Sequence, residues 1–437
     1  MRLIVTSFGS EGDTRPFLAL ADGLTSRGHE TLVCLDRSGR EEADRLGVAY
    51  RELAGDMRSH MRGGRGEEAL ARATSDGGFD GLRLFADFAR SYTTRWIAMI
   101  RMAIREHRPD VVIGSGLTVW AAHAAAEVSV VRFATAGAFP LAPTRAFPSV
   151  VSPGMPPAWL NLATHHVATQ LMWSAFRRPV DRARRALGLR RFTAIWNDVP
   201  AVYGYSPTLL PTPDDWRSNV RVCGDWHLDE PNWVPPQALA DFLAAGEPPV
   251  YVGFGSMVGT DDVTRTVLDG LGAWEGRRIV LNPGWNGAGI EGLPDYVHVI
   301  GPTPHSWLLP RCAAAVHHCG AGTTHAAARA GIPSIPVPFA ADQPFWARRL
   351  AATGVASEPL DRRRLTVTDV RRAAKQVTRP SIRGRARQIA AEMAREDSVG
   401  AVIDHLSTWS TPPAGVCREN SRNKDRSETR ARTAESR

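Results

Sequence analysis

The chain has 437 residues, which is too long for one hydrophobic core and fits two domains of about 200 residues each. Its composition, with 43% hydrophobic and 22% charged residues, excludes a disordered or fibrous protein. The formal net charge is +8, but the arginines are scattered rather than gathered with aromatic residues. The charge therefore indicates no nucleic-acid partner, and a small anionic ligand such as a diphosphate accounts for it.

The five cysteines stand at wide spacings without a CxxC pair, which argues against a disulfide framework or a zinc site. This usage favours a reducing, cytoplasmic location. The chain enters a strand-like segment at Leu3 without a signal-peptide pattern, and no apolar run reaches the roughly 18 residues that a membrane span requires. We therefore expect a cytoplasmic protein without a transmembrane segment, and leave peripheral contact with a membrane open.

Apolar strands and helices alternate in the first half of the chain. An expected strand at Leu3–Phe8 leads through a Gly/Ser/Asp loop to a helix from about Arg15 to Arg27, which Asp13 or Thr14 can cap. The elements expected next are a strand at Thr31–Leu35, a long helix at about Asp80–Arg105, and strands at Asp110–Gly114 and Val128–Phe133. This alternation predicts a parallel sheet covered on both faces.

Pro, Asp and Trp residues interrupt the pattern between Tyr205 and Pro236 and indicate a linker. Strands are expected again at Pro249–Gly253, Arg278–Leu281, Val297–Ile300, Ala314–His317 and Ser334–Val337. The sequence thus predicts an α/β protein with two doubly wound, Rossmann-like parallel-sheet domains that face each other across a cleft. The expected divisions are domains at 1–215 and 237–380, a linker at 216–236, helices at 381–410 with a return to the N-terminal domain left open, and a disordered basic tail at 411–437.

Two neighbouring strand-to-helix turns in the second domain point to a ligand. The loop His317–Thr324 combines small residues with the start of a helix, whose free N–H groups and dipole attract an anion. Its alternative is a plain helix cap with packed histidines. Asp342-Gln343 follow the next strand, and a carboxylate beside a carboxamide suits sugar hydroxyls. The alternative there is an N-cap Asp with an exposed Gln. Both turns leave the same edge of the sheet, so we expect them to meet.

The run GPTPHSWLLPRCAAAVHHCGAGTTHAAARAGIPSIPVPFAADQPFWARRL resembles the donor-binding segment of the GT-B glycosyltransferases, which include sterol glucosyltransferases and bacterial macrolide and glycopeptide transferases. SFGSEGDTRPFLALADGLTSRGHET, YSPTLLPTPDDW and VYVGFGSM are similar to the same family, in the same order. The resemblance implies a GT-B fold and inverting transfer of a hexose from a UDP- or dTDP-sugar to an apolar, hydroxylated acceptor. It implies no metal and no cofactor, with the N-terminal domain binding the acceptor and the C-terminal domain the donor.

The resemblance also implies roles for single residues. His318 and the run Gly320–Thr323 hold the diphosphate, Asp342-Gln343 hold the sugar, and Asp13 is the general base. The expected donor-binding residues are Ser10, Gly255, Ser256, Thr303, His317, His318, Gly320, Ala321, Gly322, Thr323, Asp342 and Gln343. Ile300 stands where plant relatives carry a base-stacking Trp, so the backbone around Thr303–His305 is expected to hold the base. Glu11 replaces an Arg, Gln or His of many relatives, and no donor contact is carried over for it.

Other interpretations of the sequence stay open at this point. Trp96, Trp120 and Phe139 are candidates for the acceptor pocket, although each alone is better suited to a core. Asp13 can be a simple helix cap instead of a base. The chain can also be a catalytically silent nucleotide-sugar-binding homologue or a partner protein. An NAD-dependent dehydrogenase is a weaker alternative, because the opening glycine loop places the Asp13 carboxylate where a pyrophosphate needs neutral backbone.

Overall fold

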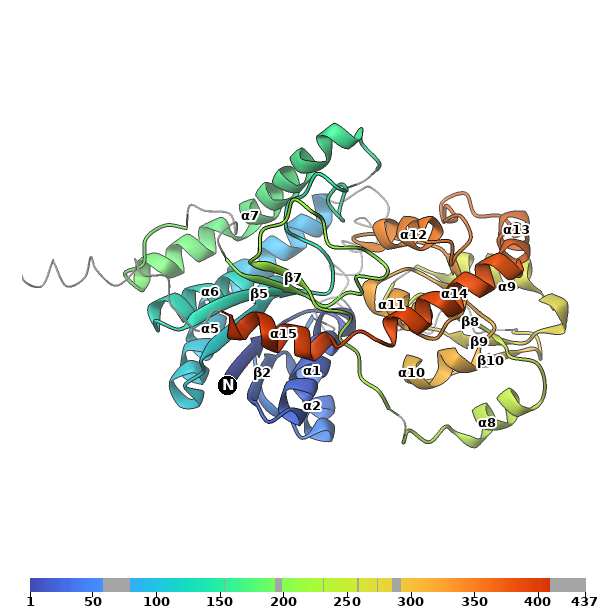
Figure 1. Cartoon of the computed structure of the whole chain (residues 1–437), viewed down its shortest axis with the longest axis horizontal. Coiled ribbons are helices and arrows are strands. Elements are labelled where there is room, and N and C mark those ends of the chain that lie inside the picture. Colours follow the sequence, from blue (N-terminus) through green and yellow to red (C-terminus); the bar gives the residue numbers. More distant parts are fainter. Residues whose placement is uncertain are drawn as a thin grey trace, which may run out of the picture.

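The computed structural model describes residues 1–57, 79–152, 154–192, 199–230, 232–257, 259–272, 274–284 and 292–408. Two lobes lie side by side, and each is built on a parallel sheet (Figure 1). The predicted class, two doubly wound parallel-sheet domains, is confirmed. The predicted tail at 411–437 lies outside the described residues.

The first lobe holds a seven-stranded sheet in the order β3-β2-β1-β4-β5-β6-β7. Its strands are β1 (Arg2–Thr6), β2 (Glu30–Leu35), β3 (Ala49–Glu52), β4 (Val111–Ser115), β5 (Arg132–Gly137), β6 (Ala201–Tyr203) and β7 (Val220–Val222). Alternate residues of β1 enter different cores: Leu3 and Val5 pack on one face of the sheet and Ile4 on the other. A strand with two buried faces needs this continuous apolar pattern.

The helices of the first lobe are α1 (Glu11–Ser26), α2 (Arg40–Leu46), α5 (Phe79–His107), α6 (Val119–Val128) and α7 (Asn161–Ala186). Helix α1 begins earlier than expected because Ser10, not Asp13 or Thr14, is its N-cap. Ser10 and Asp13 form a capping box, in which Asp13 sits in the first turn and accepts from the Ser10 backbone N–H. The expectation that Asp13 or Thr14 caps the helix is therefore wrong by one turn.

The second lobe holds a five-stranded sheet in the order β10-β9-β8-β11-β12. Its strands are β8 (Val250–Gly253), β9 (Ile279–Asn282), β10 (Val297–Val299), β11 (Ala314–His317) and β12 (Ser334–Pro336). Its helices are α8 (Gln237–Ala244), α9 (Asp261–Leu271), α10 (His305–Leu308), α11 (Ala321–Arg329), α12 (Gln343–Ala352), α13 (Val367–Val377) and α14 (Pro380–Met393). No helix in the described part of the chain is both long and apolar enough to cross a membrane.

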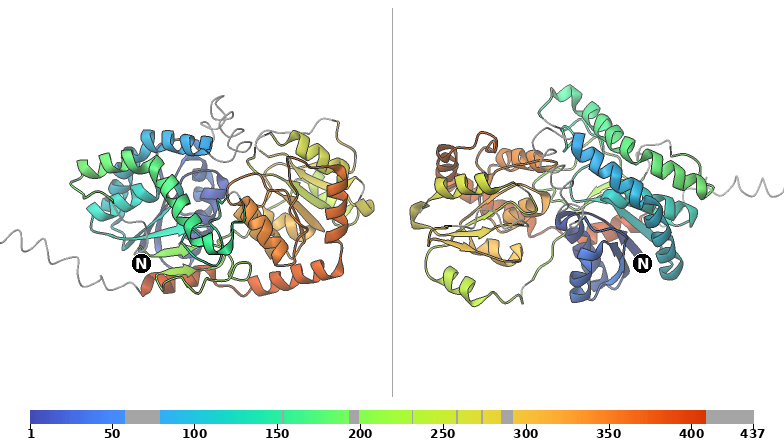
Figure 2. Two further views of the ribbon diagram at one scale, coloured as in Figure 1. Left: turned by 90° about the horizontal axis from the view of Figure 1, so that it is seen from above. Right: turned by 180° about the vertical axis from the view of Figure 1, so that it is seen from behind.

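The chain crosses between the lobes twice. Strand β7 pairs with β6, so Val220–Val222, placed in the linker from sequence, belong to the first sheet. The polypeptide returns after α14 through α15 (Ser398–Ser407), which lies along the first lobe in Figures 1 and 2. Val402 and Leu406 of α15 enter the core that α1 forms with the first sheet. Both ends of the second lobe are thereby tied to the first.

Candidate active site

The site lies where the strand order of each sheet reverses. In the first sheet the chain runs from β1 outward to β3 and returns at β4, so the loop after β1 opens at the reversal point. In the second sheet it runs from β8 outward to β10 and returns at β11, which places the loops after β8 and β11 side by side. Parallel sheets bind ligands at the carboxyl ends of strands at such points.

The loop after β11 ends at the N-terminus of helix α11. Gly320 is the N-cap, and Ala321, Gly322 and Thr323 form the first turn. The first N–H groups of a helix have no acceptor within it and point outward. Gly322 is exposed, and a Cβ at that position would meet no atom within 4 Å, so the backbone there is open to a ligand. The turn has the form of an anion site.

The adjacent histidines His317 and His318 lie in different environments. His317 is fully buried, its Nδ1 accepts from the Cys319 N–H at 3.2 Å, and its Nε2 lies 3.0 Å from the Ser334 hydroxyl. Since Nδ1 is an acceptor, Nε2 carries the hydrogen and donates to Ser334. Burial lowers the pKa of His317 to about 3. The structure therefore does not bring His317, a sequence-predicted donor residue, into the site.

His318 lies between the two loops of the second lobe. A Cβ on Gly320 would stand 2.7 Å from its Nε2, and a Cβ on Gly255 would stand 2.9 Å from its Cε1. Gly255 also has a φ of +61, a backbone conformation that favours glycine, so both this conformation and the contact with His318 exclude a side chain at this position. Burial lowers the pKa of His318 to about 4, which keeps the ring neutral at pH 7. Ser256 follows Gly255 in the same loop, half-buried.

Asp342 and Gln343 close the site from the next turn. The Asp342 carboxylate accepts from the backbone N–H of Ala321, which joins the two turns. Burial raises the pKa of Asp342 to about 7, and the negative charge of Asp13 adds to the effect. The Gln343 Oε1 accepts from the Phe339 N–H at 2.8 Å and its Nε2 contacts the Met257 sulfur at 3.3 Å. Gln343 thus holds its own loop against the loop after β8.

Two residues of these turns have left-handed backbone conformations. Cys319 has φ 65 and Ala341 has φ 56, although neither is glycine. Such conformations cost on the order of 1–3 kcal/mol each and persist where the surroundings impose them, often at ligand sites. The two strained positions lie directly beside His318 and Asp342.

Asp13 belongs to the first lobe and faces this assembly. Its Oδ2 accepts from the Ser10 N–H at 2.8 Å and from the Ser10 hydroxyl at 2.9 Å. Neighbouring atoms crowd the carboxyl group, although the residue keeps surface open to solvent, and this desolvation raises its pKa against the Ser10 hydrogen bonds. A Cβ on Gly9 would lie 2.4 Å from the Asp13 Oδ2, so glycine there leaves room for the carboxylate. The charges of Asp13 and Asp342 act on each other across the interface of the lobes.

Thr303 lines a cavity between the lobes. The cavity has a volume of about 520 Å³, and its other walls include Arg15 of α1, Arg45 of α2, Trp233 of the linker, and Pro302. Burial lowers the pKa of the nearby His305 to about 4, and the charge of Arg15 contributes. Arg15 and Arg45 of the first lobe therefore stand close to the loop after β10, where both pair with Glu230 in the same cavity wall.

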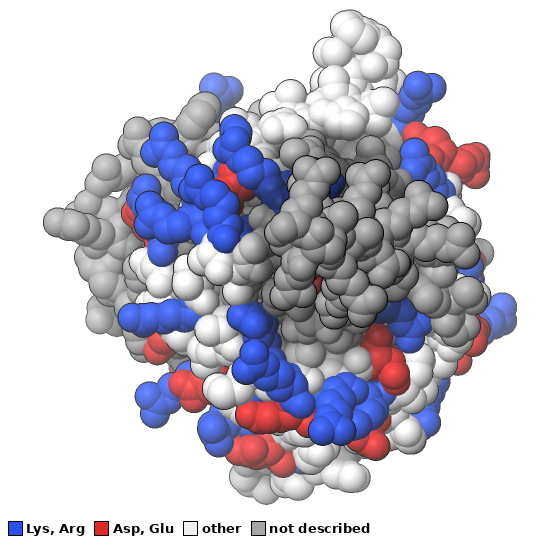
Figure 3. Space-filling view, turned by 90° about the vertical axis from the view of Figure 1, so that its left-hand side faces the viewer, with Lys and Arg blue, Asp and Glu red and all other residues white. Residues whose placement is uncertain are grey.

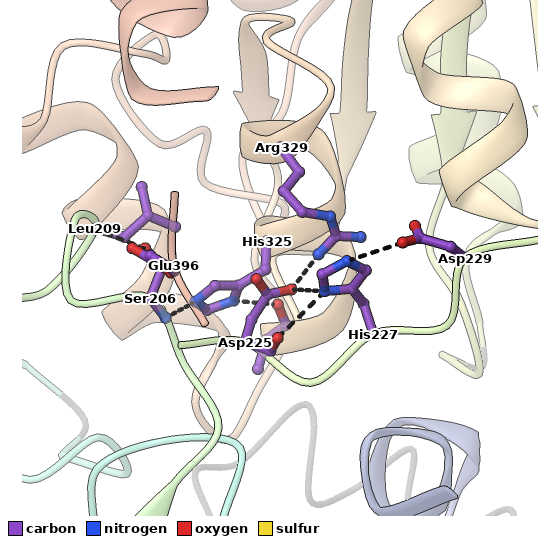
Figure 4. A network of polar contacts seen from close by, with 9 residues as sticks. Ser206, Leu209, Asp225, His227, Asp229, His325, Arg329 and Glu396 are labelled. Carbon is purple, nitrogen blue, oxygen red and sulfur yellow. Dashed lines mark hydrogen bonds and ion pairs between the residues drawn. The ribbon is translucent and has the colours of Figure 1, made fainter. Parts of the chain in front are cut away.

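A polar network ties α11 to both crossings between the lobes (Figure 4). The Ser206 N–H donates to His325 Nε2 at 3.1 Å, so His325 Nδ1 carries the hydrogen that it donates to the Ala321 carbonyl at 2.7 Å. Arg329, at the other end of α11, donates to the Asp225 carboxylate of the linker. Burial opposes the charge of Asp225, but Arg329 and His227 hold its pKa well below the usual range.

Glu396 completes the network at the second crossing. The Ser206 hydroxyl donates to its Oε1 at 2.6 Å, and the Thr208 hydroxyl donates to the same atom at 2.8 Å. The first turn of α11 is thus fixed relative to the strand ends of the first lobe. Sequence reasoning missed His325, Arg329 and Glu396, and the available signal was a histidine and an arginine in an otherwise small-residue helix.

The acceptor candidates occupy different places. Trp96 is fully buried, with its indole N–H donating to the Ala54 carbonyl at 2.7 Å, and Trp120 stacks on Phe176 with ring centroids 4.3 Å apart. Both are core residues, as large aromatic rings often are. Phe139 is half-buried in the loop after β5, at the carboxyl edge of the first sheet. Trp96 packs against Phe8 of the loop after β1, and Trp120 lies in the first turn of α6, which follows β4, so all three lie toward the edge that carries Asp13. Phe139 differs from the two tryptophans in being only half-buried.

Comparisons with known proteins agree with this arrangement. The model of the erythromycin biosynthesis protein CIII-like C-terminal domain matches residues 265–408. O-mycaminosyltylonolide 6-deoxyallosyltransferase of Streptomyces fradiae is 33% identical over 94% of this chain and 97% of its own length. A sterol 3-beta-glucosyltransferase of Arabidopsis thaliana is 29% identical over 92% of this chain, which spans 64% of the plant protein.

Solved structures show the same fold at low identity. The kitacinnamycin glycosyltransferase aligns with a TM-score of 0.69 at 19% identity, over 93% of this chain and 98% of its own. The glycosyltransferase VinC, solved with dTDP, aligns with a TM-score of 0.64 at 21% identity, over 93% of this chain and 99% of its own. The predicted GT-B fold is confirmed, and the chain belongs to the glycosyltransferase family that contains these macrolide and sterol transferases.

Proposed function

We propose that the protein transfers a hexose from a UDP- or dTDP-sugar to a hydroxyl group of an apolar aglycone, with inversion at the anomeric carbon and without a metal ion. The observation that carries the proposal is the contact between α1, whose first turn holds Asp13, and α11, whose first turn is the anion site beside Asp342. The relatives, a transferase of O-mycaminosyltylonolide and several sterol glucosyltransferases, favour a natural-product or sterol-like acceptor.

In this proposal the donor diphosphate lies on the N-terminus of α11. The backbone N–H groups of Gly322 and Thr323 and the helix dipole stabilise its charge, which grows as the sugar leaves. His318, neutral at pH 7, offers a hydrogen bond rather than a cation. Asp342 accepts hydrogen bonds from the sugar hydroxyls, and Gln343 keeps Asp342 in place through its bonds to the same loop.

Asp13 takes the proton of the acceptor hydroxyl in the proposed reaction. The acceptor oxygen forms a bond to the anomeric carbon while the bond from that carbon to the diphosphate oxygen breaks. The nucleoside diphosphate departs with the electron pair, and the proton stays on Asp13. The raised pKa of Asp13 suits a base, because proton transfer is most effective when the pKa approaches the working pH. Phe139 is the residue we assign to the acceptor pocket.

The division of the chain follows from the same proposal. The first lobe, through β7, binds the acceptor, and the second lobe binds the donor. No group of three or more His, Cys, Asp or Glu side chains within the described ranges is arranged to hold a metal ion. We also propose a cytoplasmic location, which the four described cysteines support as buried free thiols.

A screen of sugar nucleotides tests the proposal. Thermal shift should identify a UDP- or dTDP-sugar that stabilises the protein, and mass spectrometry with apolar hydroxylated acceptors should detect a product heavier by one glycosyl residue. The anomeric configuration of that product, followed by NMR, tests inversion, and activity in EDTA tests metal independence. Sugar-nucleotide binding without transfer or hydrolysis would favour the silent homologue, and tight NAD(H) binding alone would favour a dehydrogenase.

A further inference from the structure

The outer surface of helix α7 and of the loop before it is apolar in its first part. Trp159 is 81% exposed, Met155 is 67% exposed and Val167 is 58% exposed. Val151 and Leu171 are further exposed apolar side chains of the same segment. Monomeric soluble proteins rarely group large apolar side chains on their surface without a partner. The residue types also fit an interface, because tryptophan prefers the boundary between water and an apolar phase.

The same surface becomes basic further along the helix. Val167, Leu171, Arg178, Arg182 and Arg185 are all exposed and stand at intervals of three, four or seven residues, which places them on one side of α7. The opposite side carries Phe176 and Val180, which are buried against Trp120. The helix therefore presents one outward face that carries Val167 and Leu171, beside the exposed polar Gln170 and Ser174, in its first half and is cationic in its second half.

Acidic side chains are missing from this outward face of α7, all of whose residues are described. Asp181 is the single acidic residue of α7, and it is buried and paired with Arg177 and Arg191. Within the described parts of the chain, no hydrogen bond or ion pair joins Arg178, Arg182 or Arg185 to another side chain. Figure 3 shows uncharged atoms at the protruding top of this end of the molecule and, below them, Lys or Arg side chains with some Asp or Glu side chains among them.

We propose that this face of α7, with the preceding turn around Trp159, docks on an anionic lipid bilayer. Trp159, Met155, Val167 and Leu171 enter the boundary between headgroups and acyl chains, and the three arginines lie over the lipid phosphates. Binding of a helix to a membrane surface increases with the apolar area it buries and with the attraction of its basic residues to anionic lipids. Association does not require the helix to span the bilayer, in line with the absence of a spanning helix among the described residues.

Other binding partners would engage only part of this face of α7. A second copy of the chain, packed through the apolar half of the face, would leave the three arginines without an anionic partner. A nucleic acid would pair with the arginines but would leave Trp159, Met155 and Val167 exposed to water. A bilayer of anionic lipid uses both halves of the face. The inference is independent of the proposed chemistry, because none of these residues belongs to the site at the interface of the lobes.

Co-sedimentation of the full-length protein with vesicles tests the inference. We expect binding to vesicles of equimolar phosphatidylcholine and phosphatidylglycerol, and little binding to phosphatidylcholine alone. Each basic residue near an anionic surface contributes about 1 kcal/mol, so R178E/R182E/R185E should lower the partition constant on the order of a hundredfold or more. The matched control R371E/R383E/R387E reverses three exposed arginines on α13 and α14 and should leave binding near the wild-type value.

The apolar half has its own test. Trp159→Ser with Leu171→Ser should weaken vesicle binding at least tenfold, whereas Val130→Ser, at a residue that is 90% exposed elsewhere, should not change it. Circular dichroism and thermal unfolding verify that each variant is folded. Failure of the wild-type protein to bind, equal losses from both arginine triples, or binding indifferent to the serine substitutions would overturn the inference. So would a dimer in analytical ultracentrifugation that the α7 substitutions dissociate.

Discussion

Replacing Asp13 by asparagine removes the proposed base with little change to the fold. The carboxamide oxygen of the variant can still accept from the Ser10 N–H, which the Asp13 carboxylate engages at 2.8 Å. The Ser10 hydroxyl donates to the same oxygen position at 2.9 Å, so the cap is retained and the stability should change by less than the roughly 1 kcal/mol that a lost cap costs. A positioned base contributes a factor of about 10² to 10⁴. We therefore expect kcat of Asp13→Asn to fall by that factor, or about 3–5 kcal/mol in activation free energy, with donor affinity nearly unchanged.

Steady-state kinetics and donor titration measure the two effects separately. Glu11→Gln is the matched control, because Glu11 is an exposed carboxylate in the same helical turn and should leave kcat unchanged. Wild-type kcat/KM should decline toward acid with a midpoint above 3.8, the ordinary value for Asp, because the atoms crowded around the carboxyl group raise the pKa of Asp13. A variant that retains more than about a third of kcat and the wild-type pH profile would refute the role of Asp13 as the base.

Four further changes probe the site and the interface. Asp342→Asn should raise the free energy of unfolding at pH 8 by on the order of 1–3 kcal/mol, measured by urea unfolding. The reason is that the pKa of Asp342 is about 7 in the folded state and 3.8 in the unfolded state, so the wild-type protein loses stability as the pH rises from 3.8 to 7. An unchanged free energy of unfolding at pH 8 would contradict this prediction. His318→Ala should raise the donor KM about tenfold or more, the effect of one lost phosphate hydrogen bond, whereas an unchanged KM would remove His318 from the site. Gly255→Ala should also weaken donor binding, since its Cβ would stand 2.9 Å from the His318 ring, and NMR of the His318 ring should register the displacement. Arg329→Met should destabilise the protein by about 3–5 kcal/mol, because the buried carboxylate of Asp225 loses its guanidinium partner and keeps only the weaker contact with His227. The loss should diminish in R329M/D225N, and equal losses in both variants would refute the pairing.

The elements with strong apolar patterns were predictable from the sequence. The strand at Ala314–His317, the loop after it and the helix that follows are found as β11, its loop and α11. The long helix expected at about Asp80–Arg105 is found as α5 (Phe79–His107). Buried parallel strands and amphipathic helices impose periodicities that a single sequence displays.

Other elements were not predictable because their local signal is weak. Strands β6 and β7 have three residues each, and β7 lies within a segment rich in Pro, Asp and Trp. A strand of three residues is too short to show an alternating apolar pattern, and a segment rich in Pro, Asp and Trp is typical of a linker. Pairing with β6 decides that β7 is a strand, and pairing is a tertiary contact.

The candidate site shows the same division. The sequence located the anion turn but could not show which of His317 and His318 faces the ligand. Adjacent residues at the end of a strand point to opposite sides, and the sequence alone does not say which side is which. Their difference depends on Ser334 and on Gly255, which are distant along the chain. The network through His325 and Glu396 depends on the crossing of the chain between the lobes, which no local pattern encodes.

A crystal structure with bound UDP or dTDP tests the central claim most directly. The account predicts the diphosphate at the N-terminus of α11, within hydrogen-bond distance of His318 and of the backbone N–H groups of Gly322 and Thr323, with Asp342 and Asp13 facing the position of the sugar. Nucleotide density at the loop after β1, or at any place remote from α11, would contradict it.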